Sequence, residues 1–493
     1  MKIKIARIPT VTFLSGLWIW PTRYPAAMLP LLALLATLTA DPLTANREGL
    51  RALERAADAH GSETGMKLSL AIRGDVINES QSLTPLAPFE TYPFAIDVKL
   101  DQAAKRMRAE TRSAIAGDFI FTDVILLDGG KGYVLTPEIK TYREITSEPP
   151  VLSRFLPHRL IQQALQNRAS VRSLGNNVVS FATSNGQWMT LELESESGLL
   201  RRVEQVGPHG IFGDGVRESV YENYKRTGAL MLPSLVRVRS RNSVHGGIEN
   251  LYRYENARAE ATFEAGELAL PEGYAKGDWS YRENFGVKNL AKDVYLLENV
   301  TSTTGQWSYN VLVVAFDEFV FVAEAPVGSD ASEKVLAKIK ELAPGKPVRY
   351  LVQSHQHGDH LGGIRPYIAD GVTILAGPTL KPFLERIASA PFTLEPDRLQ
   401  RGPRAPIVEM VSEPRTIRDA NHEIVIYNIG PNPHARDMLI MHLPKEKILW
   451  QSDMINDGEY PENASTRDFA KKVEALGLKY ETVVGLHGRS TSN

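Results

Sequence analysis

The stretch QSHQHGDHLGG, residues 353–363, gathers four side chains that are able to ligate metal ions within six positions. These side chains are His355, His357, Asp359 and His360. Histidine is otherwise scarce, with 11 residues in 493. The run PVRYLVQS predicts a strand that leads into the cluster, so the first two imidazoles, two positions apart, point to the same side. Gly358 then allows a sharp turn before the carboxylate and the third imidazole. The pattern therefore predicts ligands for two neighbouring metal ions.

The spacing H-x-H-x-D-H resembles the signature of the metallo-β-lactamase superfamily. Three other segments extend the resemblance. The segment NPHARDMLIMHLPKEKILWQSDMI holds His434 before one predicted strand and Asp453 after the next, and ETVVGLHGRS holds His487. The strand that starts near Asn310 and ends in VAEAP resembles the opening hairpin of the family, with Glu324 where aspartate is commoner. The resemblance covers about 280–493 and implies an αβ/βα sandwich with a metal site at one edge of its two sheets.

The resemblance also implies a role for each of these residues. One metal ion would be held by His355, His357 and His434, and the other by Asp359, His360 and His487. Asp453 would bridge the two ions. Asp359 is in addition the predicted catalytic residue, because it would orient the attacking hydroxide or shuttle its proton. All seven ligands are nitrogen or oxygen, which suits two Zn²⁺ ions, although iron or manganese would also accept such a site.

This metal centre predicts an exported, zinc-dependent binuclear hydrolase of an ester, lactone, thioester or amide bond that uses a metal-bridging hydroxide. Two alternatives stay open: an iron-dependent oxidoreductase on the same scaffold, and a carrier or binding protein whose metal site is vestigial. Ligand-type residues at all seven positions favour the hydrolase. The sequence contains no G-x-S-x-G elbow, GxGxxG motif or Walker loop, and it contains no cysteine, which excludes the lactamase subclass with a cysteine ligand.

The remaining histidines are predicted to have structural roles. His422 and His442 fall within predicted strands, at no motif position. Four more are scattered through the first half of the chain: His60, His158, His209 and His245. Asp437, three residues after His434, is expected either to orient a metal ligand or to be an ordinary loop carboxylate.

Three segments must carry these residues: a leader over 1–45, a mostly β domain over 46–275 and the metal-binding α/β domain over 276–493. The leader combines Lys2, Lys4 and Arg7 with an apolar run at 26–40, which resembles a secretory signal with cleavage after Ala40. The run is too short to span a bilayer comfortably. We therefore expect a periplasmic or secreted protein with no stable membrane insertion after cleavage of the leader.

The middle segment alternates apolar and polar residues, as in MKLSLAIRG and FAIDVKLD, which predicts a mostly antiparallel sheet. One amphipathic helix is expected over 152–167. The segment weakly resembles periplasmic lipoprotein-carrier domains, whose curled sheet holds acyl chains. Beyond about 280, strands and a helix alternate, so this part is α/β. Because every expected ligand lies there, the metal domain is predicted to bind its ions without the first half.

Composition narrows the range of partners. The formal net charge is −2, from 56 basic and 58 acidic residues, which gives no polyanion-binding footprint and argues against nucleic acid. The expected partner is a small-molecule substrate, and the sequence gives no indication of the oligomeric state. A chain of 493 residues with 43% apolar residues forms more than one domain with sizeable cores.

Overall fold

The computed structural model describes residues 42–487 and 491–492, apart from 118, 138–139, 146–150, 184–185, 265, 278–284, 302–308 and 456–462. Most of the predicted leader lies outside the described residues. The described chain begins with helix α2 (Pro42–His60), and strands outnumber helices throughout. None of the helices within these ranges combines the length and apolar character needed to cross a bilayer.

The first half is built on one sheet of fourteen described strands in the order β16-β6-β5-β4-β3-β2-β1-β15-β14-β11-β10-β9-β8-β7. All neighbouring strands are antiparallel except β16 and β6. The strands are β1 (Lys67–Val76), β2 (Tyr92–Asp101), β3 (Arg106–Ile115), β4 (Phe119–Asp128), β5 (Lys131–Thr136), β6 (Thr141–Ile145), β7 (Arg172–Gly175), β8 (Val178–Ala182), β9 (Trp188–Leu193), β10 (Leu200–His209), β11 (Gly213–Glu222), β14 (Leu235–Asn242), β15 (Gly246–Ala259) and β16 (Ala275–Lys276). A separate short pair is β12 (Lys225–Thr227) and β13 (Leu230–Leu232).

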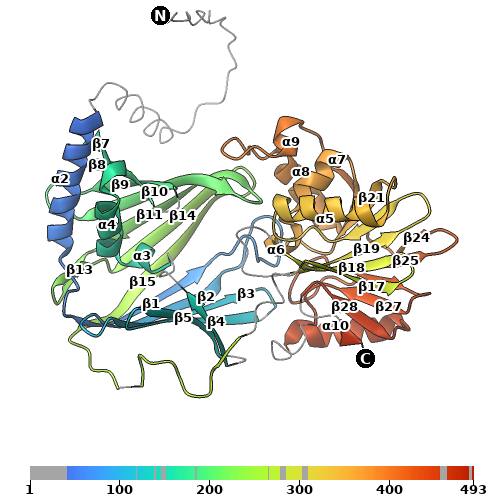
Figure 1. Ribbon diagram of the computed structural model, residues 1–493, viewed down its shortest axis with the longest axis horizontal. Helices are drawn as coiled ribbons and strands as arrows, with labels where there is room; N and C mark the ends of the chain where they lie inside the picture. The colour runs from blue at the N-terminus through green and yellow to red at the C-terminus, as the bar shows by residue number, and fades with distance from the viewer. Residues whose placement is uncertain are drawn as a thin grey trace, which may run out of the picture.

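The alternating sequence gives this sheet one buried face. In β1, Leu68, Leu70 and Ile72 are buried while the residues between them are partly exposed. The sheet curls around α2 and the helices α3 (Val151–Phe155) and α4 (Pro157–Gln166), which pack against its concave side (Figure 1). The single helix expected over 152–167 is thus two helices. Pro157 lies at the start of α4, where its missing N–H is tolerated, whereas inside one continuous helix it would break a hydrogen bond.

The second half contains two further sheets. The first has the order β17-β18-β19-β20-β21-β22-β23, and the second has the order β24-β25-β26-β27-β28-β29. The first sheet comprises β17 (Gly286–Ala291), β18 (Val294–Val300), β19 (Tyr309–Ala315), β20 (Val320–Ala323), β21 (Val348–Gln353), β22 (Thr373–Ala376) and β23 (Ile407–Met410). The second comprises β24 (Arg415–Arg418), β25 (Glu423–Asn428), β26 (Leu439–Leu443), β27 (Ile448–Gln451), β28 (Thr482–Gly485) and β29 (Thr491–Ser492).

Three apolar clusters show how these sheets are layered. One cluster joins facing residues of both sheets, such as Phe321 and Trp450, both fully buried. A second packs helices against the outer face of the first sheet, and a third packs Phe469 against the outer face of the second sheet. The helices involved are α5 (Ser329–Leu342), α7 (Ile364–Asp370) and α8 (Lys381–Ser389) on the first sheet, and α10 (Ala464–Leu476) on the second. The order of layers is therefore helix, sheet, sheet, helix.

The two halves pack against each other at the position of the short helix α6 (Gly358–Leu361), as Figure 1 shows. The turn between β10 and β11 inserts Ile211 and Phe212 into the apolar cluster of α7 and α8. Asp214 reinforces this contact, because its backbone N–H donates to the carbonyl of Pro391 at 2.7 Å. The chain between β1 and β2, residues 77–91, also reaches α6. These contacts place loops of the first half beside the histidine cluster.

Candidate metal centre

Strand ends bring the predicted ligands together. His355 and His357 follow β21, and α6 carries Asp359 and His360. His434 precedes β26, while Asp453 and His487 follow the adjacent parallel strands β27 and β28. Three groups of these side chains have ligand atoms within 4.8 Å of one another. The groups are His355–His357–His434–Asp453, Glu324–His355–His360 and Asp359–His360–His487.

In the first group, backbone and hydroxyl partners occupy one nitrogen of each imidazole. Nδ1 of His355 is 2.8 Å from Ser354 Oγ, and Nε2 of His357 donates to the carbonyl of Ser82 at 3.1 Å. The opposite nitrogens, His355 Nε2 and His357 Nδ1, are buried and have no hydrogen-bond partner among the described residues. Buried polar atoms are rarely left without a partner, so these two nitrogens fit ligands of a metal ion.

His434 completes this group in the same manner. Its Nδ1 lies 2.9 Å from the carbonyl of Ala116, so Nδ1 carries the hydrogen and Nε2 is left to face the cluster. That Nε2 is 2.8 Å from Asp453 Oδ2, and His355 Nε2 is 3.3 Å from the same oxygen. Three imidazole nitrogens and one carboxylate oxygen form a set that suits zinc.

Next to the first group lies the group Asp359–His360–His487, called the second group from here on, and the two groups meet at Asp453. Its Oδ1 atom is 3.0 Å from His360 Nε2 and 2.9 Å from His487 Nε2, although it forms no aligned hydrogen bond with either. Oδ2 of Asp359 lies 3.4 Å from His360 Nε2 and 3.5 Å from His487 Nε2. His360 Nε2 and His487 Nε2 also lie 3.4 Å apart, so these nitrogen and oxygen atoms converge on one point and fit ligands of one ion. Each oxygen of Asp453 therefore faces a different group of side chains.

Glu324 is a further residue of the metal centre, in a group with His355 and His360. The sequence comparison placed it where the family more commonly has aspartate, but it predicted no role for it. Its carboxylate is fully buried. Oε1 accepts the backbone N–H of Ser354 at 2.6 Å, and Oε2 accepts Nδ1–H of His360 at 2.9 Å. The contact fixes the hydrogen of His360 on Nδ1 and directs Nε2 at the second group. The signal in the sequence that could have identified Glu324 was its position, where the resembling family more commonly has aspartate.

Burial and neighbouring carboxylates shift the pKa values of histidines in both groups. Burial lowers the pKa of His355 to about 3, so its imidazole is neutral, as ligation requires. Burial would also lower the pKa of His487, but the charge of Asp453 and the hydrogen bond with Asp359 raise it to about 9. The pKa of His360 is raised well above its usual value because Asp453, Asp359 and Glu324 outweigh burial. This excess of negative charge favours a bound cation.

Loops of the first half hold this centre from outside. The carbonyl of Ser80 accepts the N–H of Gly358 at 2.9 Å, and Nε2 of Gln81 donates to Asp359 Oδ1 at 2.7 Å. Together with the carbonyls that hold His357 and His434, these contacts mean that the first half helps to position ligands of both groups. The prediction that the second half binds its ions without the first half stays a prediction, although these contacts show that the first half touches the ligands. The missed partners are mostly backbone carbonyls, which have no residue-type signature.

The other histidines lie away from the cluster. His422 pairs with Glu446 at 2.8 Å, and His442 bonds the carbonyl of Lys479 at 2.9 Å, in line with structural roles. The four in the first half have partners elsewhere: His60 with Ala56, His158 with Glu63, His209 with the backbone of Ile211, and His245 with Pro85. His209 also lines a cavity described below.

Asp437 does not orient a metal ligand. Its Oδ2 accepts the backbone N–H of Thr379 at 2.7 Å, and its Oδ1 accepts Nδ2–H of Asn428 at 2.9 Å. Of the two expectations for this residue, the loop carboxylate is the one that these contacts support. It braces the segment that follows β22 against the end of β25.

No protein-family model matches the chain, and no curated protein matches it. Solved structures that match include a metallo-β-lactamase from Pontibacter korlensis, with 19% identity over 42% of this chain and 94% of that chain and a TM-score of 0.33. TMB-1 gives 19% identity, 42% and 91% coverage and a TM-score of 0.33. A metallo-β-lactamase from Hirschia baltica has 17% identity over 42% of this chain and 92% of that chain, with a TM-score of 0.32. The converging side chains described above, rather than this likeness, define the site.

Proposed function

We propose that this chain is an exported binuclear metallohydrolase of the metallo-β-lactamase superfamily. It would use two Zn²⁺ ions to hydrolyse an ester, lactone, thioester or amide bond of a small molecule. The observation that carries the proposal is the Asp453 carboxylate, whose two oxygens face two separate groups of imidazoles at 2.8–3.0 Å. A carboxylate in that position is what a pair of ions would share.

The arrangement of layers supports the proposal. We take the helix–sheet–sheet–helix order of the second half to be the αβ/βα sandwich of the superfamily. The ligands lie at strand ends along one edge of both sheets, since β21 belongs to the first sheet and β27 and β28 belong to the second. Such an edge lets loops of both sheets contribute to one site.

Two bound ions would supply a polarising Lewis acid and a hydroxide nucleophile at neutral pH. Asp359 is placed to orient that nucleophile. Its side chain is 26% exposed, so a water molecule can reach it. Although burial raises the pKa of Asp359, the charges of His360 and His487 hold it well below the usual value. The carboxylate therefore stays ionised and accepts a hydrogen bond, while Gln81 fixes its other oxygen.

The two alternatives differ in what they require of these residues. A carrier with a vestigial site would tolerate the loss of individual ligands, yet all seven side chains converge and the imidazoles of the first group keep outer hydrogen-bond partners. The convergence of the side chains and the hydrogen bonds that hold the imidazoles support a working metal centre. An iron oxidoreductase would use the same ligand set, so metal analysis of the active protein separates it from the hydrolase.

The test is a hydrolysis screen on the full-length mature protein with lactone, thioester, sulfate-ester and β-lactam reporters. We expect turnover of at least one reporter by the zinc-loaded protein and none after chelation. Asp359→Asn should reduce turnover by at least 10²-fold, the scale of a lost general acid–base group. Asp437→Asn, which removes a carboxylate that touches no ligand, should keep turnover per folded molecule. Activity that survives chelation, or that falls equally in both variants, would reject the proposal.

A further inference from the structure

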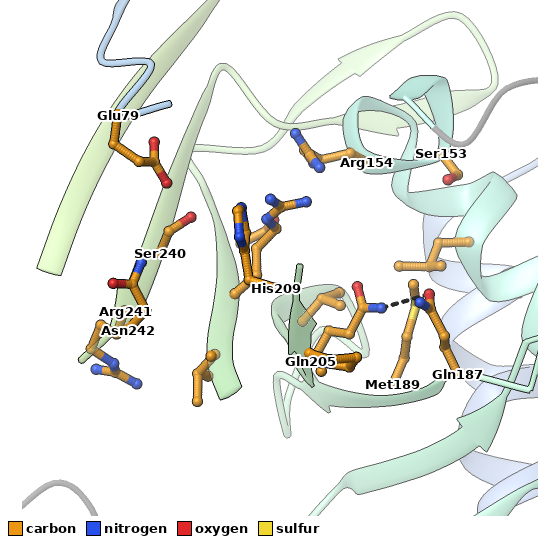
Figure 2. A pocket seen from close by; sticks show the side chains of 18 of the residues that line it. Glu79, Ser153, Arg154, Gln187, Met189, Gln205, His209, Ser240, Arg241 and Asn242 are labelled. Atoms are coloured by element: carbon orange, nitrogen blue, oxygen red, sulfur yellow. Dashed lines mark hydrogen bonds between the residues drawn. The ribbon is translucent and has the colours of Figure 1, made fainter. Parts of the chain in front are cut away.

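The curled sheet of the first half encloses a cavity of about 330 Å³, a volume in the range of small-molecule sites. Its lining comes from the concave faces of β9, β10, β11 and β14, together with α3 and α4 (Figure 2). None of the seven predicted metal ligands is among the lining residues. The cavity is therefore separate from the metal centre, and the proposed hydrolysis does not use it.

Two arginines without ionic partners face this cavity. Arg154 extends over it from α3 (Figure 2), and Arg217 of β11 is among the lining residues. Neither guanidinium has a hydrogen bond or ion pair among the residues that the structure describes, whereas several arginines on the outer face of the same sheet are paired. Arg237, for example, lies 2.9 Å from Glu222. Arg154 is partly buried, and an unpaired guanidinium in such a position costs free energy unless an anion accompanies it, whereas Arg217 is exposed.

The remaining charges leave the cavity positive. Arg241 is a third lining arginine, and Glu79 is the one lining carboxylate. His209 adds no charge at neutral pH, because burial, with a contribution from Arg217, lowers its pKa to about 4. Burial and the neighbouring charge of Arg217 also lower the pKa of Arg154, which is the direction expected of two cations that share an enclosure. The side chain of Arg241 lies on the same face of β14 as Arg237, so Arg154, Arg217 and Glu79 leave a formal excess of one positive charge in the cavity.

The rest of the lining is partly apolar. Leu160, Met189, Val203 and Tyr221 belong to it, and the apolar core of the first half lies directly behind Val203 and Tyr221. A polar pair also lines the cavity beside Met189, where Gln205 Nε2 bonds Gln187 Oε1 at 2.8 Å (Figure 2). A guanidinium pair recognises carboxylate, sulfate and phosphate groups through paired N–H donors.

The cavity lies close to the loop that carries the metal ligands. Glu79 lines it, and the next residue, Ser80, accepts the N–H of Gly358. His209 lines it as well, and Ile211 packs so closely on Gly358 that a Cβ added there would lie 2.6 Å from Ile211 Cδ1. The same two segments therefore form a wall of the cavity and a support of the metal loop.

We propose that this cavity binds a small organic anion, with a carboxylate, sulfate or phosphate head held by Arg154 and Arg217 and a short apolar body against Met189 and Val203. The site is additional to the metal centre and needs no metal ion for binding.

Binding of defined probes to the mature full-length protein tests this directly. Isothermal titration with octanoate, octyl sulfate, octyl phosphate and octanol, on metal-free and zinc-loaded protein, separates the head groups from the apolar chain. We expect at least one anion to bind at both metal states and octanol to bind at least 10-fold more weakly. The anion with the highest affinity identifies the head group.

Variants then locate the site. Arg154→Gln and Arg217→Gln should each weaken binding of that anion by 10- to 100-fold, with unchanged melting temperature for Arg217→Gln, whose side chain is exposed. Arg226→Gln removes an exposed arginine outside the cavity and should change nothing. Octanol binding equal to that of the anions, or equal losses in the cavity variants and Arg226→Gln, would overturn the proposal. Because the assay measures binding alone, its result is independent of whether the metal centre hydrolyses any substrate.

Discussion

Replacing Glu324 with glutamine should selectively weaken the second metal position. The carboxylate accepts two hydrogens, from the N–H of Ser354 at 2.6 Å and from Nδ1–H of His360 at 2.9 Å. Glutamine has one acceptor oxygen and one NH₂ group. If its oxygen faces Ser354, the NH₂ group opposes Nδ1–H, and the imidazole hydrogen moves to Nε2, which then cannot ligate. If its oxygen faces His360, a buried N–H of Ser354 loses its partner, which costs about 1–3 kcal/mol.

Loss of an outer partner of a ligand typically reduces metal affinity by about 10- to 100-fold, or about 1.4–2.7 kcal/mol. The assay is zinc titration against a competing chelator, which resolves two successive affinities. We expect one of the two affinities to fall in Glu324→Gln, while the affinity of the site with His357 and His434, which form no hydrogen bond with Glu324, changes little. Asp437→Asn is the matched control, because it also removes a buried carboxylate. Unchanged affinity in Glu324→Gln, or an equal loss in Asp437→Asn, would refute the assignment of Glu324.

Three further predictions concern the first half of the chain. Gly117→Ala should lower zinc affinity by about 10-fold or more, because its Cβ would lie 3.0 Å from His434 Nδ1. Gly130→Ala is the control, because Gly130 has a similar φ of 98° and no neighbour within 4 Å, and it should leave zinc affinity unchanged. Glu63 contributes stability above pH 4.5 that is lost as the pH falls toward 2. Burial raises its pKa, but the hydrogen bond from His158 and the charge of Arg159 outweigh burial and lower the pKa to about 2. Glu63→Gln should therefore cost about 3 kcal/mol at neutral pH and flatten the acid side of the melting profile, and a variant with the wild-type profile would contradict this. N-terminal sequencing should find a mature chain that starts near Asp41, and Met1 on the purified native protein would argue against export.

The histidine cluster was predictable because its signal is local. The residues after β21 place His355 and His357 in one ligand group, and the turn at Gly358 places Asp359 in the other. The convergence of His434 and Asp453 came from the order of segments in the resembling family. The structure brings them together, while their roles as metal ligands stay predictions.

The contribution of the first half was beyond sequence reasoning for physical reasons. The groups that hold His357 and His434 are carbonyls of Ser82 and Ala116, which any residue type would supply. Strand β3 also had no clear signal, since its sequence RMRAETRSAI buries only Met107, Ala109 and Ile115. The pairing of β1 with β15, far apart in the chain, depends on closure of the whole sheet and not on a local pattern.

The cavity lined by Arg154 and Arg217 could not be predicted from the sequence either. Arg154 falls at the end of α3, and the break at Pro157 that separates α3 from α4 is what directs it over the concave face. From the sequence, this arginine was one of many in an amphipathic segment. Only the curl of the sheet places it beside Arg217, because the two residues come from elements distant in the chain.

The most direct test of the binuclear centre is the metal content of the purified full-length mature protein after zinc reconstitution and removal of free ions. The account predicts close to two zinc ions per chain. His355→Ala should lower the content to about one or less, and His487→Ala should retain the ion of the first group. A wild-type chain that binds no zinc, or that binds one ion lost equally in both variants, would contradict a carboxylate-bridged pair of metal sites.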